Sequence, residues 1–121
     1  MTPRGRLHRS DRVLLRRDFE QILRRGRRRR GDHLGIAVLR REDDTRRIGL
    51  AVSRGCGHSP ARARMRRLLR EAFRALRADW PGIDLVVTCG RPWPDAHLPE
   101  VAAELERLVA GSLARRGRRD G

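Results

Sequence analysis

The strongest constraint on the fold lies in residues 61–76, ARARMRRLLREAFRAL, where a helical apolar pattern runs through six arginines. Apolar side chains recur there at i, i+3, i+4, i+7, i+8 and i+11, which places them on one face of an α-helix. They are Met65, Leu68, Leu69, Ala72, Phe73 and Leu76. The stripe predicts a helix packed against a core, with Phe73 inside that core rather than at a binding surface.

The other side of the same helix carries arginine. At about 100° per residue the side opposite the stripe holds Arg66, Arg67, Arg70, Arg74 and Arg77, with Arg62 and Arg64 flanking the stripe. Like charges one turn apart each cost roughly a few tenths of a kcal/mol, and arginines in the first turn oppose the helix dipole. Phosphate groups reverse both penalties. A solvated arginine face is the simpler alternative.

The charge of the whole chain favours a nucleic acid over that alternative. The 121 residues carry a net charge of +15, and all 30 basic residues are arginine. Residues 1–77 hold 24 arginines against 8 acids, whereas residues 78–121 hold 6 against 7. A field concentrated in one part of the molecule attracts a polyanion. No apolar run reaches the length of a signal or spanning segment, which predicts a cytoplasmic protein without a membrane partner.

Catalytic and metal motifs are missing from the sequence. It contains no GxSxG, HExxH or P-loop, and the 15 acids are scattered, so we predict no catalytic residue and no protein-held metal. A zinc site from His33, Cys56, His58 and Cys89 is disfavoured because Cys-Gly-His is not a usual ligand spacing. Two cysteines so far apart fit reduced thiols better than a disulfide framework.

The N-terminal half predicts a helix and two strands. Residues 10–26 read as a helix with Ser10 as its cap, and the run RRRR at 27–30 fits either a solvated loop or a short edge strand that faces a nucleic acid. Residues 34–40 and 48–53 alternate large and small side chains, which predicts two strands paired as a hairpin. A face of small residues indicates close approach by a ligand, or by a second helix.

The remaining elements complete an α/β fold. Ser59 is expected to cap the arginine helix, with Pro60 at its first position. Residues 84–90 predict a strand, and 98–113 a helix acidic enough, through Glu100, Glu104 and Glu106, to lie away from a polyanion. We therefore predict a single-domain α/β sandwich of about four strands and three helices, in the order α-β-β-β-α-β-α. The first of these strands is the run at 27–30, for which a solvated loop is the alternative. The predicted divisions are a basic arm (1–11), the domain (12–114) and a basic tail (115–121).

Three stretches resemble one known family. Residues 47–74, RIGLAVSRGCGHSPARARMRRLLREAFR, resemble the signature of the bacterial ribonuclease P protein component, with its R-N-R-x-K-R motif. RDFEQILRRG and DLVVTCGRP resemble its N-terminal and late-strand elements, so that the resemblance covers roughly residues 12–113.

The resemblance implies a subunit of the ribonucleoprotein that removes the 5′ leader from precursor tRNA. In that family the RNA subunit and its bound Mg²⁺ perform the hydrolysis. One protein per RNA docks its arginine helix and adjoining loop on the catalytic RNA. The family fold has a left-handed βαβ crossover, and the single-stranded leader is expected in a cleft between the arginine helix and the sheet.

Residue roles follow from the same resemblance. The RNA-binding set consists of Ser53, Arg54, Arg62, Arg64, Arg66, Arg67, Arg70 and Arg74. The leader-binding set consists of Phe19, Ala37 on the small face, and Ala63. Ala63 departs from the asparagine of the motif, and the chain has only four aromatic residues, so leader binding is expected to depend mainly on arginine and backbone shape. A stand-alone basic RNA-binding module, such as a ribosomal protein, is the alternative; a DNA-binding protein is less favoured because no helix-turn-helix spacing occurs.

Overall fold

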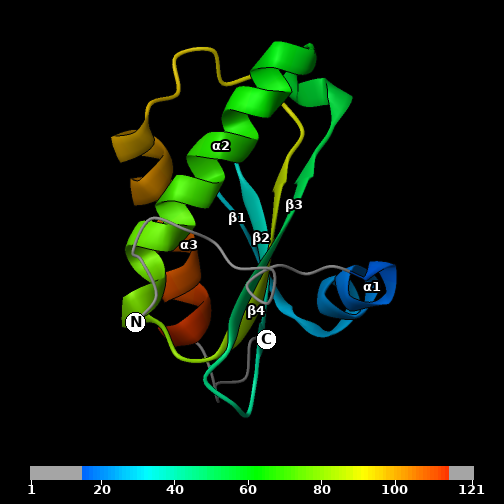
Figure 1. The fold of residues 1–121 in the computed structure, drawn as a ribbon, viewed down its shortest axis with the longest axis vertical. Coiled ribbons are helices and arrows are strands. Elements are labelled where there is room, and N and C mark those ends of the chain that lie inside the picture. Colours follow the sequence, from blue (N-terminus) through cyan, green and yellow to red (C-terminus); the bar gives the residue numbers. More distant parts are fainter. Residues whose placement is uncertain (1–14, 115–121) are drawn as a thin grey trace.

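The computed structural model describes residues 15–114, which form one mixed sheet with helices on both faces (Figure 1). The elements are α1 (Arg16–Arg25), β1 (Arg27–Arg30), β2 (Gly35–Arg40), β3 (Arg46–Val52), α2 (Ser59–Leu76), β4 (Ile83–Cys89) and α3 (Leu98–Ala114). Two short 3₁₀ helices, η2 (Arg54–Cys56) and η3 (Arg77–Asp79), flank α2. The predicted order α-β-β-β-α-β-α is confirmed, whereas Ser10, the basic arm and the basic tail lie outside the described residues.

The strand order differs from the predicted hairpin. The sheet runs β1-β2-β4-β3, with β2 antiparallel and β3 parallel to β4, so β4 lies between the two strands expected to pair. Alternation determines which face each side chain occupies, but it does not determine which strands are neighbours. The mostly apolar β4 is buried along nearly its whole length, as the central position requires. The parallel β3 and β4 are joined through α2, which is a βαβ crossover.

The arginine run at 27–30 is a strand rather than a loop. β1 pairs antiparallel with β2 from Arg27 opposite Val38 to Arg30 opposite Gly35. It follows α1 directly at Gly26, where a Cβ atom would lie 2.6 Å from the Ile22 carbonyl oxygen and 2.9 Å from that of Val38. Only glycine fits this close approach, so the chain turns from the helix straight into the edge strand.

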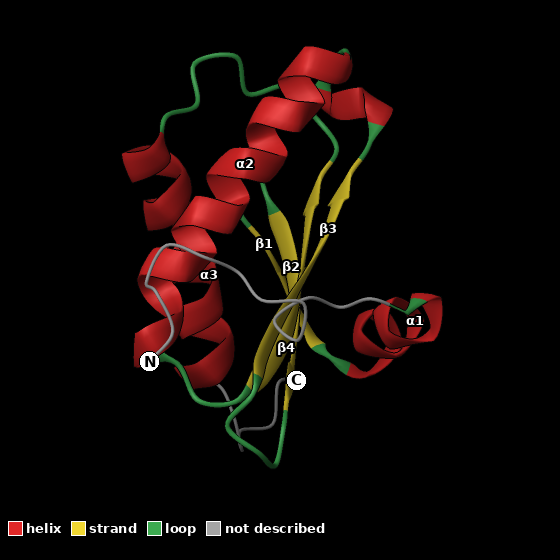
Figure 2. Cartoon of the chain, in the orientation of Figure 1, coloured by secondary structure: helices red, strands yellow, loops and turns green. Residues whose placement is uncertain are grey.

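One face of the sheet forms the main core. The predicted stripe of α2 is buried there, with Leu69, Ala72 and Phe73 fully so, and only Leu76 lies partly exposed. The facing side chains come from the large-residue positions of the strands, such as Ile48 and Leu85, and from α3. Figure 2 shows α2 and α3 together on this side of the strands and α1 alone on the other.

The opposite face is covered only in part. Ile22 of α1 packs on Ala37 and Val86, with Phe19 and Leu23 at its edges. Next along the sheet, Asp84 accepts hydrogen bonds of 2.7 and 2.9 Å from the Arg47 guanidinium.

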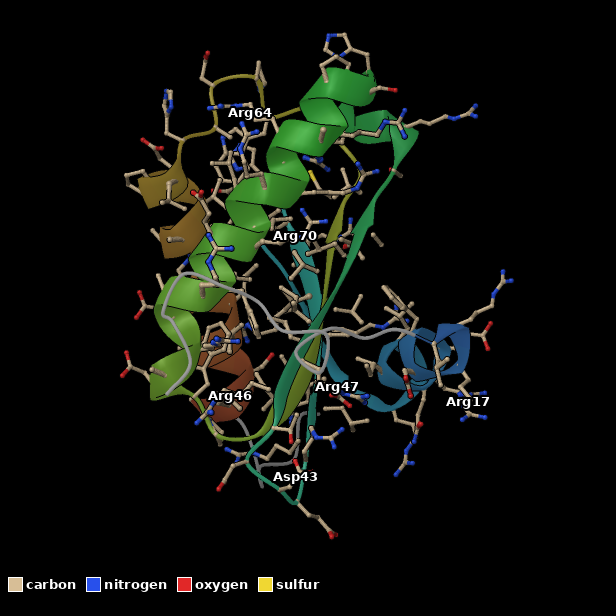
Figure 3. The ribbon with its side chains drawn as sticks, viewed as in Figure 1. Arg17, Asp43, Arg46, Arg47, Arg64 and Arg70 are labelled. Carbon is tan, nitrogen blue, oxygen red and sulfur yellow. The ribbon has the colours of Figure 1, made fainter. Side chains whose placement is uncertain are left out.

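That guanidinium also lies 3.7 Å from Asp18 of α1. In Figure 3 Arg47 lies between the sheet and α1, whereas Arg17 lies on the outer side of that helix. The Arg47 bridge holds α1 against the sheet.

The start of α2 differs from the predicted cap. The helix begins at Ser59, and His58 is the N-cap, with its Nδ1 accepting the Ala61 N–H at 3.2 Å. Gly57, which precedes it, has a φ of +141°, a conformation that favours glycine. Pro60 is therefore the second helical residue.

Candidate RNA-binding surface

The arginines of α2 and η2 form one basic surface that begins before the helix and continues along it. Arg54, Arg64 and Arg67 are exposed, and the other four α2 arginines of the predicted set are half-buried: Arg62, Arg66, Arg70 and Arg74. The first turn contains no acidic residue. Glu71, the acidic residue of α2, lies 3.9 Å from Arg74, a turn or more away from most of these arginines. This end of α2 thus presents several cations with no carboxylate beside them, a combination that suits phosphate.

Two of these arginines also shape the surface itself. Arg62 donates to the Gly57 carbonyl and the Ser59 hydroxyl, both at 3.2 Å, and so folds back over the start of α2. Arg64 donates at 2.6 Å to the carbonyl of Ala96, in the segment that leads into α3. Internal acceptors orient both guanidinium groups in the protein alone.

A groove opens on the small-residue face, beyond the part that α1 covers. Its floor is a row across the sheet in which Gly35 and Ala51 flank Thr88. Arg30 stands at the β1 end of this row, opposite Gly35. The main hollow measures about 470 Å³, and an adjoining one of about 220 Å³ extends it towards Leu23 of α1.

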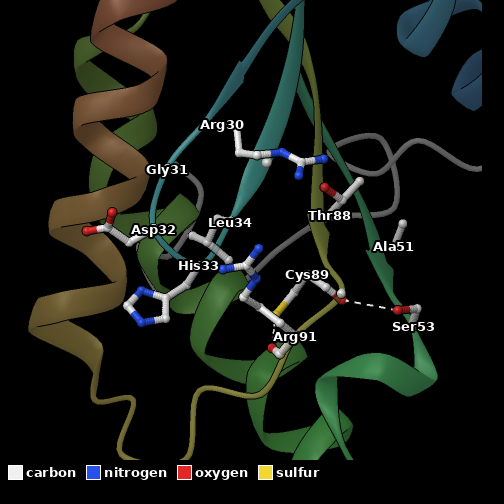
Figure 4. Close-up of a pocket in the computed structure, with 12 residues that line it drawn as sticks. Arg30, Gly31, Asp32, His33, Leu34, Ala51, Ser53, Thr88, Cys89 and Arg91 are labelled. Atoms are coloured by element: carbon white, nitrogen blue, oxygen red, sulfur yellow. Dashed lines mark hydrogen bonds between the residues drawn. The ribbon is translucent and has the colours of Figure 1, made fainter.

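The groove walls are basic. Arg30 extends from β1 across the hollow towards Thr88, and Arg91 enters from the segment after β4 (Figure 4). Arg28 lines the adjoining hollow while its guanidinium donates to the carbonyl of Leu23 at 2.6 and 2.9 Å. A floor without large side chains between arginine walls suits an extended polyanionic chain.

The predicted cleft between α2 and the sheet does not exist. The side chains between α2 and the strands form the buried core, which leaves no room for a nucleic-acid strand. The groove lies on the other face of the sheet, beside α1. The groove floor does lie on the small-residue face, at Gly35 and Ala51, but α1 rather than α2 borders it, because alternation does not reveal which helix covers which face.

The predicted leader-binding residues do not form one site. Ala37 is only 1% exposed beneath α1, so its assignment to ligand contact was wrong. Ala63 is exposed on α2, on the opposite side of the sheet from α1 (Figure 1). Phe19 is half-buried at the edge of the α1 contact, and its role remains a prediction.

Arg91 and Thr88 were missed in the sequence, and Arg30 was considered only as part of the run at 27–30. The resemblance covered their segments, but no local pattern showed that they meet.

A buried carboxylate holds the rim of the groove. Glu104 of α3 is 4% exposed and accepts the backbone N–H groups of His33 and Leu34, both at 2.8 Å. The His33 ring lies 3.0 Å from its other oxygen and stacks on Trp93 at 3.7 Å. Burial raises the pKa of Glu104, but these hydrogen bonds outweigh it and hold the pKa below its ordinary value. Glu104 was counted among the acids expected to keep α3 away from a polyanion, but its carboxylate is buried and engaged inside the protein.

Metal-binding side chains are not gathered in the described part of the chain. Residues 15–114 contain no group of three or more His, Cys, Asp or Glu placed to hold a metal ion. His33 and His58 are engaged with Glu104 and the α2 cap, whereas Cys56 and Cys89 are buried, free thiols that lie together. No helix among the same residues is long and apolar enough to cross a membrane.

Known proteins share this fold and sequence. The family model described as ribonuclease P matches residues 7–112. The ribonuclease P protein component of Chlamydia trachomatis is 36% identical over 91 residues, which cover 74% of this chain and 76% of that protein. The same component from Shouchella clausii is 30% identical over 105 residues, which cover 85% of this chain and 86% of that protein.

Solved structures of ribonuclease P proteins have a similar fold. The ribonuclease P protein of Staphylococcus aureus superimposes with a TM-score of 0.75 at 22% identity, covering 84% of this chain and 94% of that one. The ribonuclease P protein of Thermotoga maritima superimposes with a TM-score of 0.61 at 27% identity, covering 91% of this chain and 98% of that one.

An α/β sandwich with an arginine-rich crossover helix and a basic groove is the architecture of an RNA-binding protein. The chain belongs to the bacterial ribonuclease P protein family. It is a protein subunit of the tRNA-processing ribonucleoprotein endonuclease, and its partner is ribonuclease P RNA.

Proposed function

We propose that the two basic surfaces divide the work: the α2 surface binds the catalytic RNA, and the groove beside α1 binds the single-stranded 5′ leader of precursor tRNA. The observation that carries the proposal is their separation. The α2 surface and the groove floor occupy opposite faces of one sheet, so two RNA segments can be bound at once (Figure 1). The predicted domain 12–114 contains both surfaces.

The α2 surface suits a folded RNA. Seven arginines of η2 and α2 lie within 21 residues, from Arg54 to Arg74, on a rigid helix that is anchored in the core. Phosphates of a structured RNA come at fixed spacings, so a rigid set of cations matches them better than a mobile tail. Ser53 and Arg54, at the junction with β3, connect this surface to the groove.

The groove suits a single strand. The row of Gly35, Thr88 and Ala51 leaves space for a chain to lie on the sheet, and Arg30 and Arg91 are placed to pair with its phosphates. Phe19, at the edge of the α1 contact, is the aromatic side chain proposed to stack on a leader base. Base stacking is worth about 1 to 3 kcal/mol per base. With one such ring, affinity is expected to come mainly from charge.

Mg²⁺ belongs to the RNA in this proposal, with one protein bound per RNA. The described residues offer no three-ligand group, so they do not fit a resident metal site, and no step of hydrolysis is assigned to the protein. The protein's contribution is to neutralise phosphate charge and to position substrate, both of which lower the concentration of free cations needed.

The test is reconstitution with a bacterial ribonuclease P RNA. Cleavage of a precursor tRNA is followed at low millimolar Mg²⁺, with and without the protein, and we expect the protein to restore cleavage that the RNA alone does not sustain. Arg67→Glu is compared with Arg107→Glu, which makes the same charge change at an exposed residue of α3. Arg67→Glu should weaken RNA binding about tenfold or more, whereas Arg107→Glu changes it little. Equal effects would argue against α2 as the docking surface.

The groove is tested separately with Arg30→Ala and Arg91→Ala. These changes should raise the KM for a precursor tRNA with a leader of several nucleotides, and leave affinity for the ribonuclease P RNA unchanged. Loss of affinity for both RNAs would mean that the groove belongs to the docking surface.

A further inference from the structure

Two cysteines that are distant in sequence meet in space. The Cys56 and Cys89 sulfur atoms lie 3.4 Å apart across 33 positions of sequence, and both side chains are buried, with 4% and 1% exposure. Both are free thiols. A disulfide bond is about 2.05 Å long, so the sulfurs need to approach by only about 1.4 Å to bond.

The pair lies where the two basic surfaces meet. Cys56 ends η2, two residues after Arg54, and Cys89 is the last residue of β4, just before Gly90 and Arg91. The segments already touch, because the Ser53 N–H donates to the Cys89 carbonyl at 3.1 Å. A bond between the sulfurs would therefore act on the loop at the start of α2.

The two sulfurs differ in their surroundings. The Cys89 thiol donates to the Cys56 sulfur, and burial together with that hydrogen bond raises the pKa of Cys89, so Cys89 stays protonated. Cys56 accepts this hydrogen bond two residues before the His58 cap, at the positive end of α2. Because Cys89 keeps its proton, we assign the attack on the oxidant to Cys56.

Both sulfurs adjoin space that a small oxidant can enter. Cys89 lines the groove, and Cys56 lines a separate cavity of about 330 Å³ between the first half of α2 and the segment 92–96. The pair thus separates two hollows that open on opposite sides of it.

We propose that Cys56 and Cys89 are a reversible redox pair, and that their disulfide weakens binding of the ribonuclease P RNA by displacing the loop that carries Arg54. The Cys56 sulfur attacks a peroxide oxygen, the O–O bond breaks, and the Cys56 proton goes to the departing oxygen, so that Cys56 becomes a sulfenic acid and water leaves. The Cys89 sulfur then attacks the Cys56 sulfur and passes its proton to the hydroxyl group, which leaves as a second water. Two thiols are oxidised and one peroxide is reduced, and a dithiol reverses the bond.

The displacement follows from close packing at Gly55. A Cβ atom on that residue would lie 2.2 Å from the Gly90 carbonyl oxygen, so the backbones of the two segments are already in contact there. The loop cannot simply slide towards β4 to close the gap between the sulfurs. We expect the loop to rotate instead, and Arg54 and the first turn of α2 to rotate with it. The functional consequence rests on the proposed role of the α2 surface.

The first experiment tests the bond without RNA. The full-length protein is treated with a small molar excess of hydrogen peroxide, quenched, alkylated and digested for mass spectrometry. We expect a linked pair of peptides containing Cys56 and Cys89, two mass units lighter than their sum and lost on treatment with dithiothreitol. Sulfinic or sulfonic acids without that linked pair, or links only between molecules, overturn the proposal.

The second experiment measures RNA affinity of the reduced, oxidised and re-reduced protein. We expect the oxidised form to bind ribonuclease P RNA about threefold to tenfold more weakly, the loss of one or two phosphate contacts, with recovery after dithiothreitol. Cys89→Ala, treated identically, should show no such change. The comparison of reduced, oxidised and re-reduced wild-type protein remains valid even if Cys89→Ala folds poorly.

The outcomes separate the two proposals. If the bond forms and affinity is unchanged, the control of RNA binding is wrong. If the reduced protein itself fails to bind the RNA, the proposed function of α2 is wrong, while the peptide analysis still decides whether the redox pair exists.

Discussion

The two faces of the sheet differ in how completely they are filled. On the α2 and α3 face, large side chains from alternate strand positions interlock with two helices and leave no groove. On the α1 face, small residues accept one short helix over Ala37 and Val86, and the next row, from Gly35 to Ala51, remains open. Residue size at alternate positions thus decides which face becomes core and which keeps space for a ligand.

Truncation within the filled face should produce the largest effect. Phe73→Ala is expected to lower the free energy of unfolding by about 4 kcal/mol, because the ring is fully buried and its neighbours cannot collapse into the space. Urea unfolding followed by circular dichroism measures this loss. Leu76→Ala, at the partly exposed end of the same stripe, is the control and should cost less. A similar loss for the two variants would mean that the filled face is less tightly packed than described.

Removal of the Asp84 carboxylate tests how α1 is held on the other face. Asp84→Ala leaves Arg47 without its main partner and should lower the free energy of unfolding by about 3 kcal/mol. The same carboxylate helps to hold the pKa of Arg47 above its ordinary value. Asp43→Ala removes an exposed partner of Arg41 and should have little effect. An equal loss of unfolding free energy in Asp43→Ala would mean that burial does not make the Asp84 ion pair more stabilising than an exposed one.

Acid should weaken the link that Glu104 makes from the filled face to the groove rim. Because folding lowers its pKa, the stabilisation by Glu104 is present above the ordinary value of 4.5 and is lost as the pH falls through the lower, folded pKa. Thermal unfolding between pH 6 and about 3 should therefore show stability falling with pH. Glu104→Gln should cost about 2 kcal/mol at neutral pH and make that decline shallower. An unchanged pH slope in the variant would show that other carboxylates dominate it.

Phe19→Ala should have the smallest effect on stability and should separate folding from binding. The ring is only half-buried at the edge of the α1 contact, so about 1 kcal/mol is expected from urea unfolding. Affinity for precursor tRNA should fall by up to about tenfold, while affinity for mature tRNA and for the ribonuclease P RNA stays constant. Equal losses for all three RNAs would make Phe19 a core residue only.

Local patterns predicted most of the elements because they depend on near neighbours. The stripe from Met65 to Leu76 determined both α2 and its buried face, and alternation determined which residues of β2 and β3 share a side. The helix cap was predicted one residue late, since His58 has an unusual side chain for that role and the pattern Ser-Pro points to Ser59.

The site was predicted less completely than the fold. The basic surface of α2 follows from composition and helical spacing, and the resemblance supplied its partner. The groove could not be located, because Arg30, Thr88 and Arg91 come from three separate segments and meet only through strand pairing. The burial of Ala37 and Glu104 could not be predicted from the sequence for the same reason, since it depends on which helix packs over which part of the sheet.

By itself the sequence determined the element types, the stripe that becomes core, the basic charge of α2 and the family. Each of these follows from residues a few positions apart or from a motif read in order. The tertiary structure alone decided that β4 separates β2 from β3, that α1 rather than α2 borders the groove, and that Cys56 lies against Cys89. Those relations join residues tens of positions apart, and only the packing of the whole chain brings such residues together.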